Sequence, residues 1–352
     1  MTDRAALVAG LPTGPRHPVT GTPARRPGSV RRTTSIEERW EDFGRPRTVR
    51  ASGRDLVTSV DGSAEVRDAA SLELRTDGAG NVATIRTEPT VVELDGLVGT
   101  GTRSGFRAAV GAVAPGAVRP GTVLHQLLDD VPLAALIASY GLTREHPEWN
   151  IPPEATARLR NLCAGWQDGA TMMGALDATG IFPIPEGPVA PPLDSEDDPL
   201  GWHDIAPMDR RTVRRVRRLD LWHTDGAVAV EAYFRDSHLG AEGPEDVLHE
   251  YTVAMTLGPA AGPSDALRVE SATATAHTLP WPECPGAVAS VDRVVGTAVT
   301  GLVDLVARDL TGTSTCSHLN DVLRSAGGVA VLAALLPGPA DRATNGTEEE
   351  RR

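Results

Sequence analysis

The chain has no lysine, so all 34 of its basic residues are arginines. This absence excludes a Schiff base, a pyridoxal phosphate anchor and a Walker-type phosphate loop, because each of them requires a lysine side chain. Aromatic residues make up only 4% of the 352 residues, so valine, leucine, alanine and isoleucine must supply most of the core. Three cysteines are too few for a disulfide scaffold, and they indicate a reducing compartment.

An excess of positive charge is also missing, because the formal net charge is −13. Domains that read nucleic acid are usually basic, and anionic membranes repel an acidic protein, so we expect neither partner. No apolar run approaches the ~20 residues that span a bilayer. The apolar residues 5–11 are interrupted by Gly10 and followed by Pro12, which is not the pattern of a signal peptide. The sequence therefore predicts a cytoplasmic protein.

Three segments have compositions that are typical of irregular structure. Residues 1–30 are rich in proline, arginine and glycine, and residues 337–352 run from Pro-Gly-Pro into a charged end. Neither segment has enough apolar surface to offset the entropy of ordering, so we expect disordered tails. Residues 183–198 combine several prolines with an acidic run, which predicts a linker.

The sequence between these segments contains an apparent internal repeat. The phrase Leu94-Asp-Gly-Leu-Val-Gly-Thr100 resembles Val291-Asp-Arg-Val-Val-Gly-Thr297, and further matches follow in the same order. Upstream, Arg31-Arg32 takes a place similar to that of Arg217-Arg218. We interpret residues 31–142 and 213–336 as two copies of one unit, separated by a helical and proline-rich segment over 143–212.

Each copy shows strands first and helices afterwards. Alternating and β-branched patterns predict strands over 216–223, 227–234, 247–257 and 267–277 in the second copy, and over 49–57, 70–75 and 82–87 in the first. Apolar helical faces follow over 299–310 and 317–336, with a break near Gly327-Gly328, and residues 154–179 add further helix. The predicted fold is α+β, with two antiparallel sheet-plus-helix units related by a pseudo-twofold axis.

Only the second copy has chemically reactive residues at its expected helix starts. Cys284 precedes Pro285, and Cys316 and His318 lie in Thr315-Cys-Ser-His-Leu319. With Thr315 as N-cap, Cys316 would occupy the first helical turn, where free backbone N–H groups lower a thiol pKa. One hypothesis is therefore catalysis by Cys316, His318 and Cys284, with thiol or acid–base chemistry.

Other interpretations of these residues remain open. The same three residues, with His277 or His223 as a fourth ligand, would suit a zinc ion, although Cys-x-His is a weak metal signal. Both cysteines are also compatible with simple core packing. For substrate binding the candidates are Arg217, Arg218, Asp236 and His277, since paired arginines suit an anionic ligand. No organic cofactor is predicted.

The order of motifs over about 213–335 resembles the family called domain of unknown function 2889. The resemblance depends on Arg217-Arg218, Asp236, Pro282-Glu-Cys-Pro-Gly-Ala287 and Cys316-Ser-His-Leu319. Residues 26–33 resemble the longer actinobacterial-type members. Two departures are Thr315, where the family usually has glycine, and Leu302, where it often has tryptophan.

The resemblance implies a link to bacterial catabolism of aromatic or acyl compounds. The residues themselves favour a small-molecule enzyme of lyase or hydrolase type, in which Cys316 is nucleophile or acid and His318 is the base. A non-catalytic ligand-binding or assembly protein with structural cysteines is one alternative. A structural zinc protein is the other.

Overall fold

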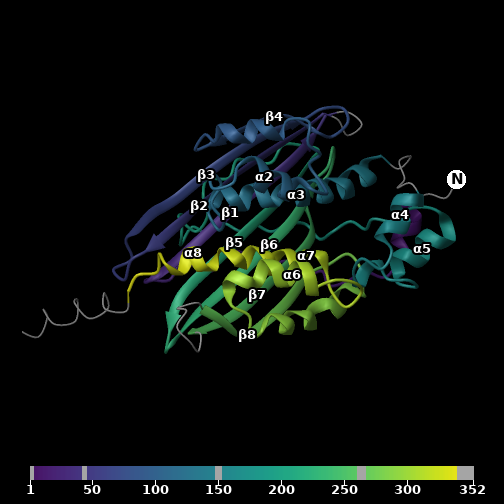
Figure 1. Cartoon of the computed structure of the whole chain (residues 1–352). Coiled ribbons are helices and arrows are strands. Elements are labelled where there is room, and N and C mark those ends of the chain that lie inside the picture. The colour runs from purple at the N-terminus through teal and green to yellow at the C-terminus, as the bar shows by residue number, and fades with distance from the viewer. Residues whose placement is uncertain (1–3, 42–45, 147–152, 260–266, 339–352) are drawn as a thin grey trace, which may run out of the picture.

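The computed structural model describes residues 4–41, 46–146, 153–259 and 267–338. Its centre is one antiparallel sheet of eight long strands with the order β4-β3-β2-β1-β5-β6-β7-β8 (Figure 1). Each half of the chain contributes a four-stranded meander, and the two meanders join through β1 and β5. The strands are β1 (Ser29–Trp40), β2 (Arg47–Thr58), β3 (Ala64–Thr76), β4 (Val82–Glu88), β5 (Thr212–Thr224), β6 (Ala227–Leu239), β7 (Asp246–Pro259) and β8 (Leu267–Thr278).

The strands of the second half form where the sequence alternates apolar and polar residues. Along β7, the alternate residues Tyr251, Val253 and Met255 are buried in one core cluster. The hairpin between β5 and β6 closes through Asp225-Gly226, where Gly226 has the positive φ of 77° that this tight turn requires. All four strands predicted in this half are present, with somewhat wider bounds.

The helices cover one face of the sheet (Figure 1). Over the first half lie η1 (Val92–Leu97), α2 (Phe106–Val113) and α3 (Val123–Glu145). Over the second half lie η3 (Cys284–Val294), η4 (Val299–Gly301), α6 (Leu302–Asp309), α7 (Ser317–Ser325), η5 (Ala326–Gly328) and α8 (Val329–Ala333). Helix α3 contacts β1, β2, β3 and β5, so it crosses the centre of the sheet.

Irregular segments cover much of the other face behind the second half. The linker accepts a hydrogen bond there from Arg235 at the carbonyl of Pro191, and its Ala190 N–H donates to the carbonyl of Glu245. The remaining elements connect these layers: α1 (Arg4–Ala9), α4 (Pro153–Leu159), η2 (Ala164–Trp166) and α5 (Thr171–Thr179). The hydrogen bonds at Pro191 and Ala190 hold the segment 183–198 against the sheet.

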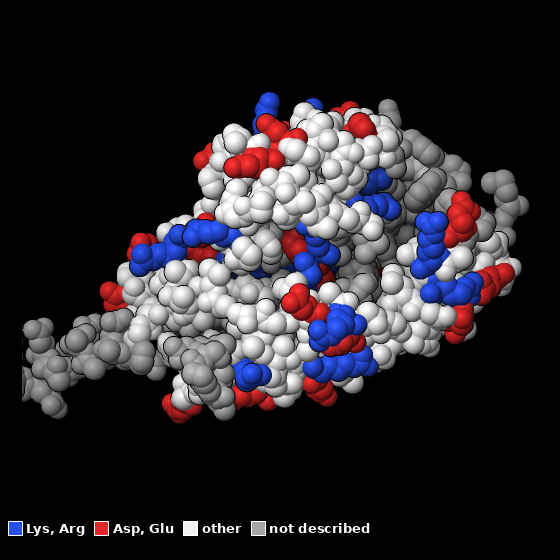
Figure 2. Space-filling model, in the orientation of Figure 1, with Lys and Arg blue, Asp and Glu red and all other residues white. Residues whose placement is uncertain are grey.

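The buried apolar residues form two clusters. One includes Ile36, Val49, Leu72 and Phe106, between the first-half strands and α2 and α3. The other lies under the second-half helices and extends to α5 and η2. On the face that Figure 2 shows, arginines and acidic residues are interspersed, so the negative net charge is not concentrated there.

The structure differs from the sequence expectations at three places. Strand β1 was not predicted, and it begins inside the expected tail of residues 1–30. Part of that segment is ordered, because the backbone N–H groups of Gly14 and His17 bond to Pro280 and His277. The two expected sheets are one continuous sheet. Of the expected C-terminal tail, residues 339–352 lie outside the described residues.

Candidate functional site

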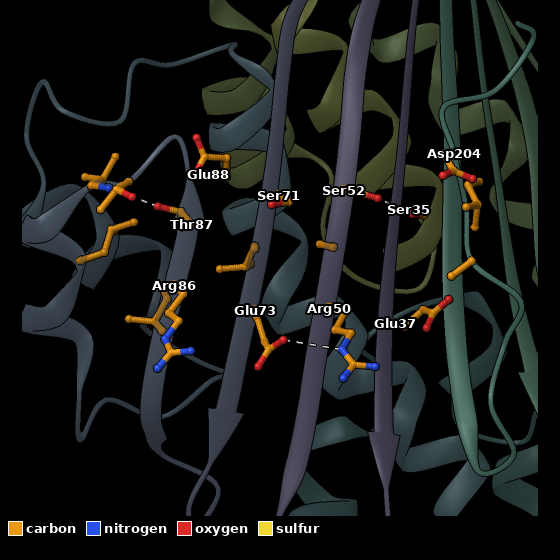
Figure 3. Close-up of a pocket in the computed structure, with 18 of the residues that line it drawn as sticks. Ser35, Glu37, Arg50, Ser52, Ser71, Glu73, Arg86, Thr87, Glu88 and Asp204 are labelled. Carbon is orange, nitrogen blue, oxygen red and sulfur yellow. Dashed lines mark hydrogen bonds and ion pairs between the residues drawn. The ribbon is translucent and has the colours of Figure 1, made fainter.

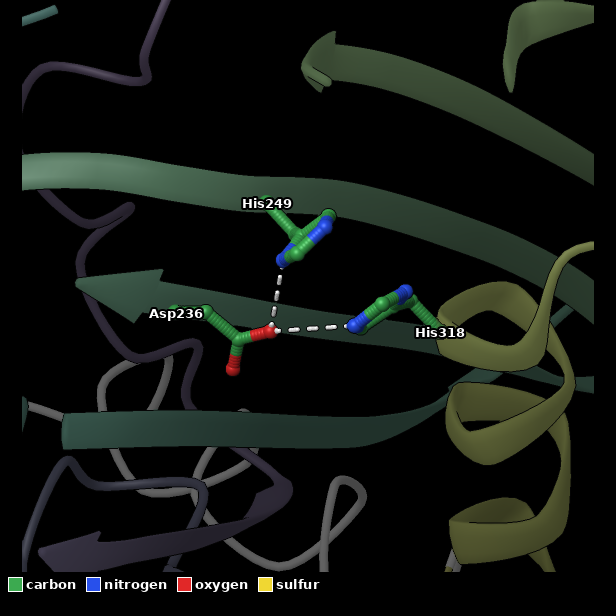
Figure 4. Close-up of side chains that lie close together, drawn as sticks. All are labelled: Asp236, His249 and His318. Atoms are coloured by element: carbon green, nitrogen blue, oxygen red, sulfur yellow. Dashed lines mark ion pairs between the residues drawn. The ribbon is translucent and has the colours of Figure 1, made fainter. Parts of the chain in front are cut away.

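Asp236, His249 and His318 converge in the second half (Figure 4). The Oδ2 atom of Asp236 lies 3.3 Å from His249 Nδ1 and 3.8 Å from His318 Nε2. The two imidazole rings stack, with ring centroids 3.6 Å apart and an interplanar angle of 18°. All three residues are buried, and Asp236 has no exposed surface. We call these three residues the Asp–His–His cluster.

Strand pairing and one helix start assemble this cluster. Asp236 and His249 are direct cross-strand partners in β6 and β7, and a register shift follows at once between Asp236 and Ser237. Such a bulge re-aims side chains locally. Helix α7 begins at Ser317, so its first turn places His318 over the two strands. The ring of Phe234 also lies nearly parallel to that of His318, with ring centroids 6.5 Å apart.

Arg215 fixes the carboxylate of the cluster. Its Nε and Nη2 atoms donate to Oδ1 and Oδ2 of Asp236 at 2.5 and 2.7 Å. Burial by itself would raise the pKa of Asp236, but the Arg215 guanidinium outweighs it and holds that pKa well below its usual range. Asp236 is therefore an anion in a site without solvent.

The pKa of His318 shifts in the direction that keeps its ring neutral. Burial is the largest cause, and the adjacent imidazole of His249 adds to it, while the Asp236 carboxylate opposes both. The result is a pKa well below the ordinary value for histidine. At neutral pH, His318 thus has a lone pair on one of its ring nitrogens.

A network of ion pairs lies beside the cluster, between the sheet and the helices. Arg215 also donates to Asp321 of α7 at 2.7 Å. Arg217 binds Asp130 of α3 through both Nε and Nη2 at 3.0 Å, and it also contacts Asp321. Buried ion pairs of this kind are costly to break because one partner would remain as an uncompensated charge. Arg217 is therefore already bound to protein carboxylates.

Two of the sequence candidates lie on the opposite face of the sheet. Successive strand residues point to opposite faces, so Arg218 points away from Arg217. Arg218 pairs with Asp220 at 2.7 Å and with Glu231. His277 contacts the Thr252 hydroxyl at 2.9 Å, on the face that Arg235 and Glu250 share. Of the predicted residues, Asp236 and His318 thus meet in the cluster, and Cys284 lies close enough to Cys316 for that thiol to contribute to its raised pKa.

The cysteines are not at activated positions. Cys316 is the N-cap residue of α7, rather than a residue of its first turn, and Thr315 instead bonds to the carbonyl of Gly312. Burial raises the pKa of Cys316 and outweighs the nearby backbone N–H groups, so the expected low pKa was wrong. Burial also raises the pKa of Cys284, and it raises that of Cys163 to about 11.

The metal set expected from sequence does not assemble either. Among the described residues, one group of at least three potential ligands has donor atoms within 4.8 Å of one another, namely the Asp–His–His cluster. It contains no cysteine, and neither His277 nor His223 belongs to it. His249 and Arg215 were missed by the sequence reasoning. A histidine at a core-facing position of a buried strand, between Val247 and Tyr251, was the available signal.

Larger cavities lie on the other face of the sheet. One of ≈ 810 Å³ has Ser35, Ser52 and Ser71 across its floor, and charged residues such as Arg50 and Glu73 beside them (Figure 3). Another of ≈ 850 Å³ is lined by the linker, Arg54, Arg214 and Arg235. At the cluster, a cavity of only ≈ 10 Å³ reaches His249 beside Tyr140 and Pro188. That volume is about the space of one water molecule.

Comparison with known proteins identifies one family. Residues 213–332 match the model of the family described as "Protein of unknown function (DUF2889)", so this part of the chain is similar to that family. The match spans β5 to α8 and includes all three residues of the cluster. No curated protein and no solved structure matches the chain. No helix among the described residues is long and apolar enough to cross a membrane.

Proposed function

We propose that the chain is an enzyme of hydrolase or lyase type, acting on a small organic molecule at the Asp–His–His cluster. The observation that supports this most is that two imidazoles converge on one buried carboxylate oxygen, within 3.3 and 3.8 Å. Histidine and carboxylate groups placed together are the usual means of proton transfer in such reactions. Buried ionisable groups that serve only packing would be expensive to retain.

The proposed roles differ from those expected for the cysteines. Asp236, held by Arg215, would fix the orientation of the two rings and remain an anion. His318 and His249 would move protons or activate water. Cys316 and Cys284 would support the site by packing, because burial disfavours their thiolates. Arg217 would stabilise the network behind the site, whereas Arg218 and His277 lie on the opposite face.

The gene duplication inferred from the sequence is also part of this proposal. In the first half, Arg32 faces Asp55 across β1 and β2, and it bonds through Nε and Nη2 at 2.6 and 2.7 Å. Arg215 and Asp236 have the same relation across β5 and β6. A register shift follows Asp55 as it follows Asp236. These pairs favour Arg215, rather than Arg217 or Arg218, as the counterpart of Arg32.

The same comparison supports a site that is functional in one copy only. Asp55 pairs with Asp68 in β3, as Asp236 pairs with His249 in β7. Asp68 accepts a hydrogen bond from the backbone N–H of Val123 at the start of α3. His318 is the residue that the sequence repeat aligns with Val123. The first half would thus have lost both imidazoles and would serve as a scaffold.

A second candidate function is the binding of a polar ligand without chemistry. It is favoured by the ≈ 810 Å³ cavity, where the half-buried Ser52 and the exposed Ser71 offer hydroxyl groups beside Ser35, whose own hydroxyl contacts His203. The three serine side chains of the floor are small and polar. The charged residues Glu37, Arg50 and Glu73 also line the cavity. Such a cavity suits a flat polar ligand.

Turnover of a chemically diverse panel separates these two functions. The purified chain is incubated with esters, amides and hydroxy acids, including aromatic ones, and depletion is followed by mass spectrometry. We expect His318→Gln and His249→Gln to reduce turnover at least about a hundredfold. Asp68→Asn in the first half is the matched control, and this variant should retain turnover. Near-UV circular dichroism shows whether each variant is folded.

Two results would contradict the enzyme proposal. One is turnover that survives in both folded histidine variants. The other is a wild-type chain that turns over nothing but retains a ligand in native mass spectrometry and loses it in Ser71→Arg, which fills the outer cavity. The second result would instead support the binding function.

A further inference from the structure

We infer that Asp236, His249 and His318 bind one divalent transition-metal ion. This inference rests on the site of the proposed function and specifies its chemistry. The donor atoms of the three residues lie within 4.8 Å of one another. Two histidines and one carboxylate are a common ligand set for zinc and for non-haem iron.

The strongest support comes from unsatisfied nitrogens. Neither His249 Nδ1 nor His318 Nε2 makes a hydrogen bond of normal geometry, although both atoms are buried. A buried polar atom without a partner costs free energy, and its presence calls for an explanation such as a missing ion. Both atoms point toward Asp236 Oδ2 from different elements (Figure 4). A single ion between them would satisfy both nitrogens.

The hydrogen bonds around Asp236 are of the kind that usually orient the carboxylate ligands of a metal ion. Arg215 donates to both carboxylate oxygens, so the orientation of the carboxylate is set before any ion arrives. Each carboxylate oxygen has two lone pairs, so Oδ2 has one left after the bond from Arg215. Hydrogen bonds from residues around the metal ligands hold those ligands in orientation and affect how strongly they bind the ion.

Charge balance indicates what else would bind the ion. The ion-pair network beside the cluster, which is buried at Arg215 and Arg217 and partly exposed at Arg107 and Arg324, contains as many arginines as carboxylates: these four arginines with Asp129, Asp130, Asp236 and Asp321. A divalent cation would therefore add positive charge that the protein does not neutralise. An anionic ligand, such as hydroxide or the carboxylate or phenolate of a substrate, would compensate it.

Three protein ligands also leave coordination positions open. Structural zinc sites are almost always closed by four protein ligands, whereas catalytic sites keep a position for water or substrate. The ≈ 10 Å³ cavity at His249 is the space that the structure provides next to a ligand. The site therefore leaves room for a water molecule beside the ion, as catalytic sites do, in place of a fourth protein ligand.

Metal titration of the full chain tests this inference. The chain is treated with chelator, dialysed and titrated with Co²⁺ and Zn²⁺, and the bound metal is measured by plasma mass spectrometry. We expect one ion per chain. The Co²⁺ spectrum should show d–d bands without a thiolate charge-transfer band, because no cysteine belongs to the ligand set.

Variants separate this site from the cysteine site that the sequence suggested. His318→Gln and His249→Gln should weaken binding at least about a hundredfold, more than the loss of a supporting residue does. Cys316→Ser and Asp68→Asn should bind as the wild-type chain does. Binding of less than one ion per chain by the wild type, a thiolate band, or full binding by the histidine variants would overturn the inference.

The same samples distinguish failure of this inference from failure of the proposed function. If the metal-free chain keeps turnover that depends on His318, the metal inference is wrong and the enzyme proposal stands. If the ion binds as expected but no tested compound is turned over with it, the metal inference stands and the enzyme proposal fails.

Discussion

His203 Nε2 lies 2.9 Å from the hydroxyl oxygen of Ser35, at the floor of the outer face of the sheet. The other ring nitrogen, Nδ1, lies 2.9 Å from Thr33 Oγ1, so both nitrogens are engaged by hydroxyl groups of β1. Burial lowers the pKa of His203 to about 4, and Arg54 and Arg214 contribute to this shift. The irregular segment before β5 is therefore attached to the sheet by the neutral imidazole of His203.

This attachment predicts that acid destabilises the protein. The folded-state pKa of about 4 is below the ordinary value of 6.5, so the unfolded chain binds more protons between these pH values. Stability should therefore fall as the pH decreases from about 6.5 to about 4, with a contribution from His203 on the order of 3 kcal/mol. Urea unfolding at several pH values measures it.

His203→Gln is the control for this prediction, because glutamine can hydrogen-bond but does not titrate. The variant should be less stable than the wild-type chain at pH 7 and should lose less stability toward pH 4.5. His125 and His277 also have lowered pKa values and remain in both proteins. Equal pH slopes in the two proteins would show that His203 is not the group responsible.

The two similar cross-strand ion pairs predict large stability losses with unequal functional effects. Arg215 and Arg32 are both buried, and each binds the aspartate opposite it, while Arg215 also binds Asp321. We expect Arg215→Met and Arg32→Met each to cost about 3–5 kcal/mol, because a carboxylate is left buried without its partner. Only Arg215→Met should also weaken metal binding, since the group of potential ligands found among the described residues contains Asp236 and not Asp55.

Chemical denaturation measures the loss of stability in each arginine variant, and metal titration measures how each variant binds metal. Removing both members of a pair, as in Arg32→Met with Asp55→Leu, should cost less than Arg32→Met alone. If the double variant were the less stable of the two, the explanation by an uncompensated charge would be wrong.

The second half of the fold could be predicted from sequence because its strands show local signals. Alternation along β7 and the Asp-Gly turn before β6 are both visible in short windows. Strand β1 has no such signal, because six of its residues from Arg31 to Ile36 are buried but only one is apolar. Its arginines are satisfied by partners distant in sequence, such as Asp220 for Arg31. No local pattern reveals partners of this kind.

The site was predictable to a similar extent. His318 and Asp236 were identified by their places in motifs, but the sequence gives no distance between them. Arg217 and Arg218 were treated as one anchor, although the period of two in a strand already places adjacent residues on opposite faces. The thiol of Cys316 was expected to be activated by a helix start, and burial outweighs that effect. Burial depends on the whole fold.

The raised thiol pKa values predict slow alkylation of all three cysteines in the native chain. Burial removes access and disfavours the thiolate, which is the reactive form. Iodoacetamide at pH 7.5, followed by peptide mass spectrometry, should modify none of them before denaturant is added and all of them afterwards. Rapid native modification of Cys316 would return the thiol hypothesis to consideration.

The pairing of β1 with β5 predicts how the second half behaves alone. Thr34 faces Arg217 at the centre of this pair, and the flanking pairs Arg32 with Leu219 and Ile36 with Arg215 are arranged symmetrically around it. Two copies of residues 208–338 that paired through β5 in the same register would therefore place Arg217 opposite Arg217. Like charges directly opposite are destabilising, and Asp130 of α3 would be absent.

We expect this fragment to dimerise poorly and the fragment with Arg217→Thr to dimerise at least about tenfold more tightly. Light scattering after size-exclusion chromatography measures both, and equal dimerisation of the two fragments would argue against an ancestral dimer joined at this position.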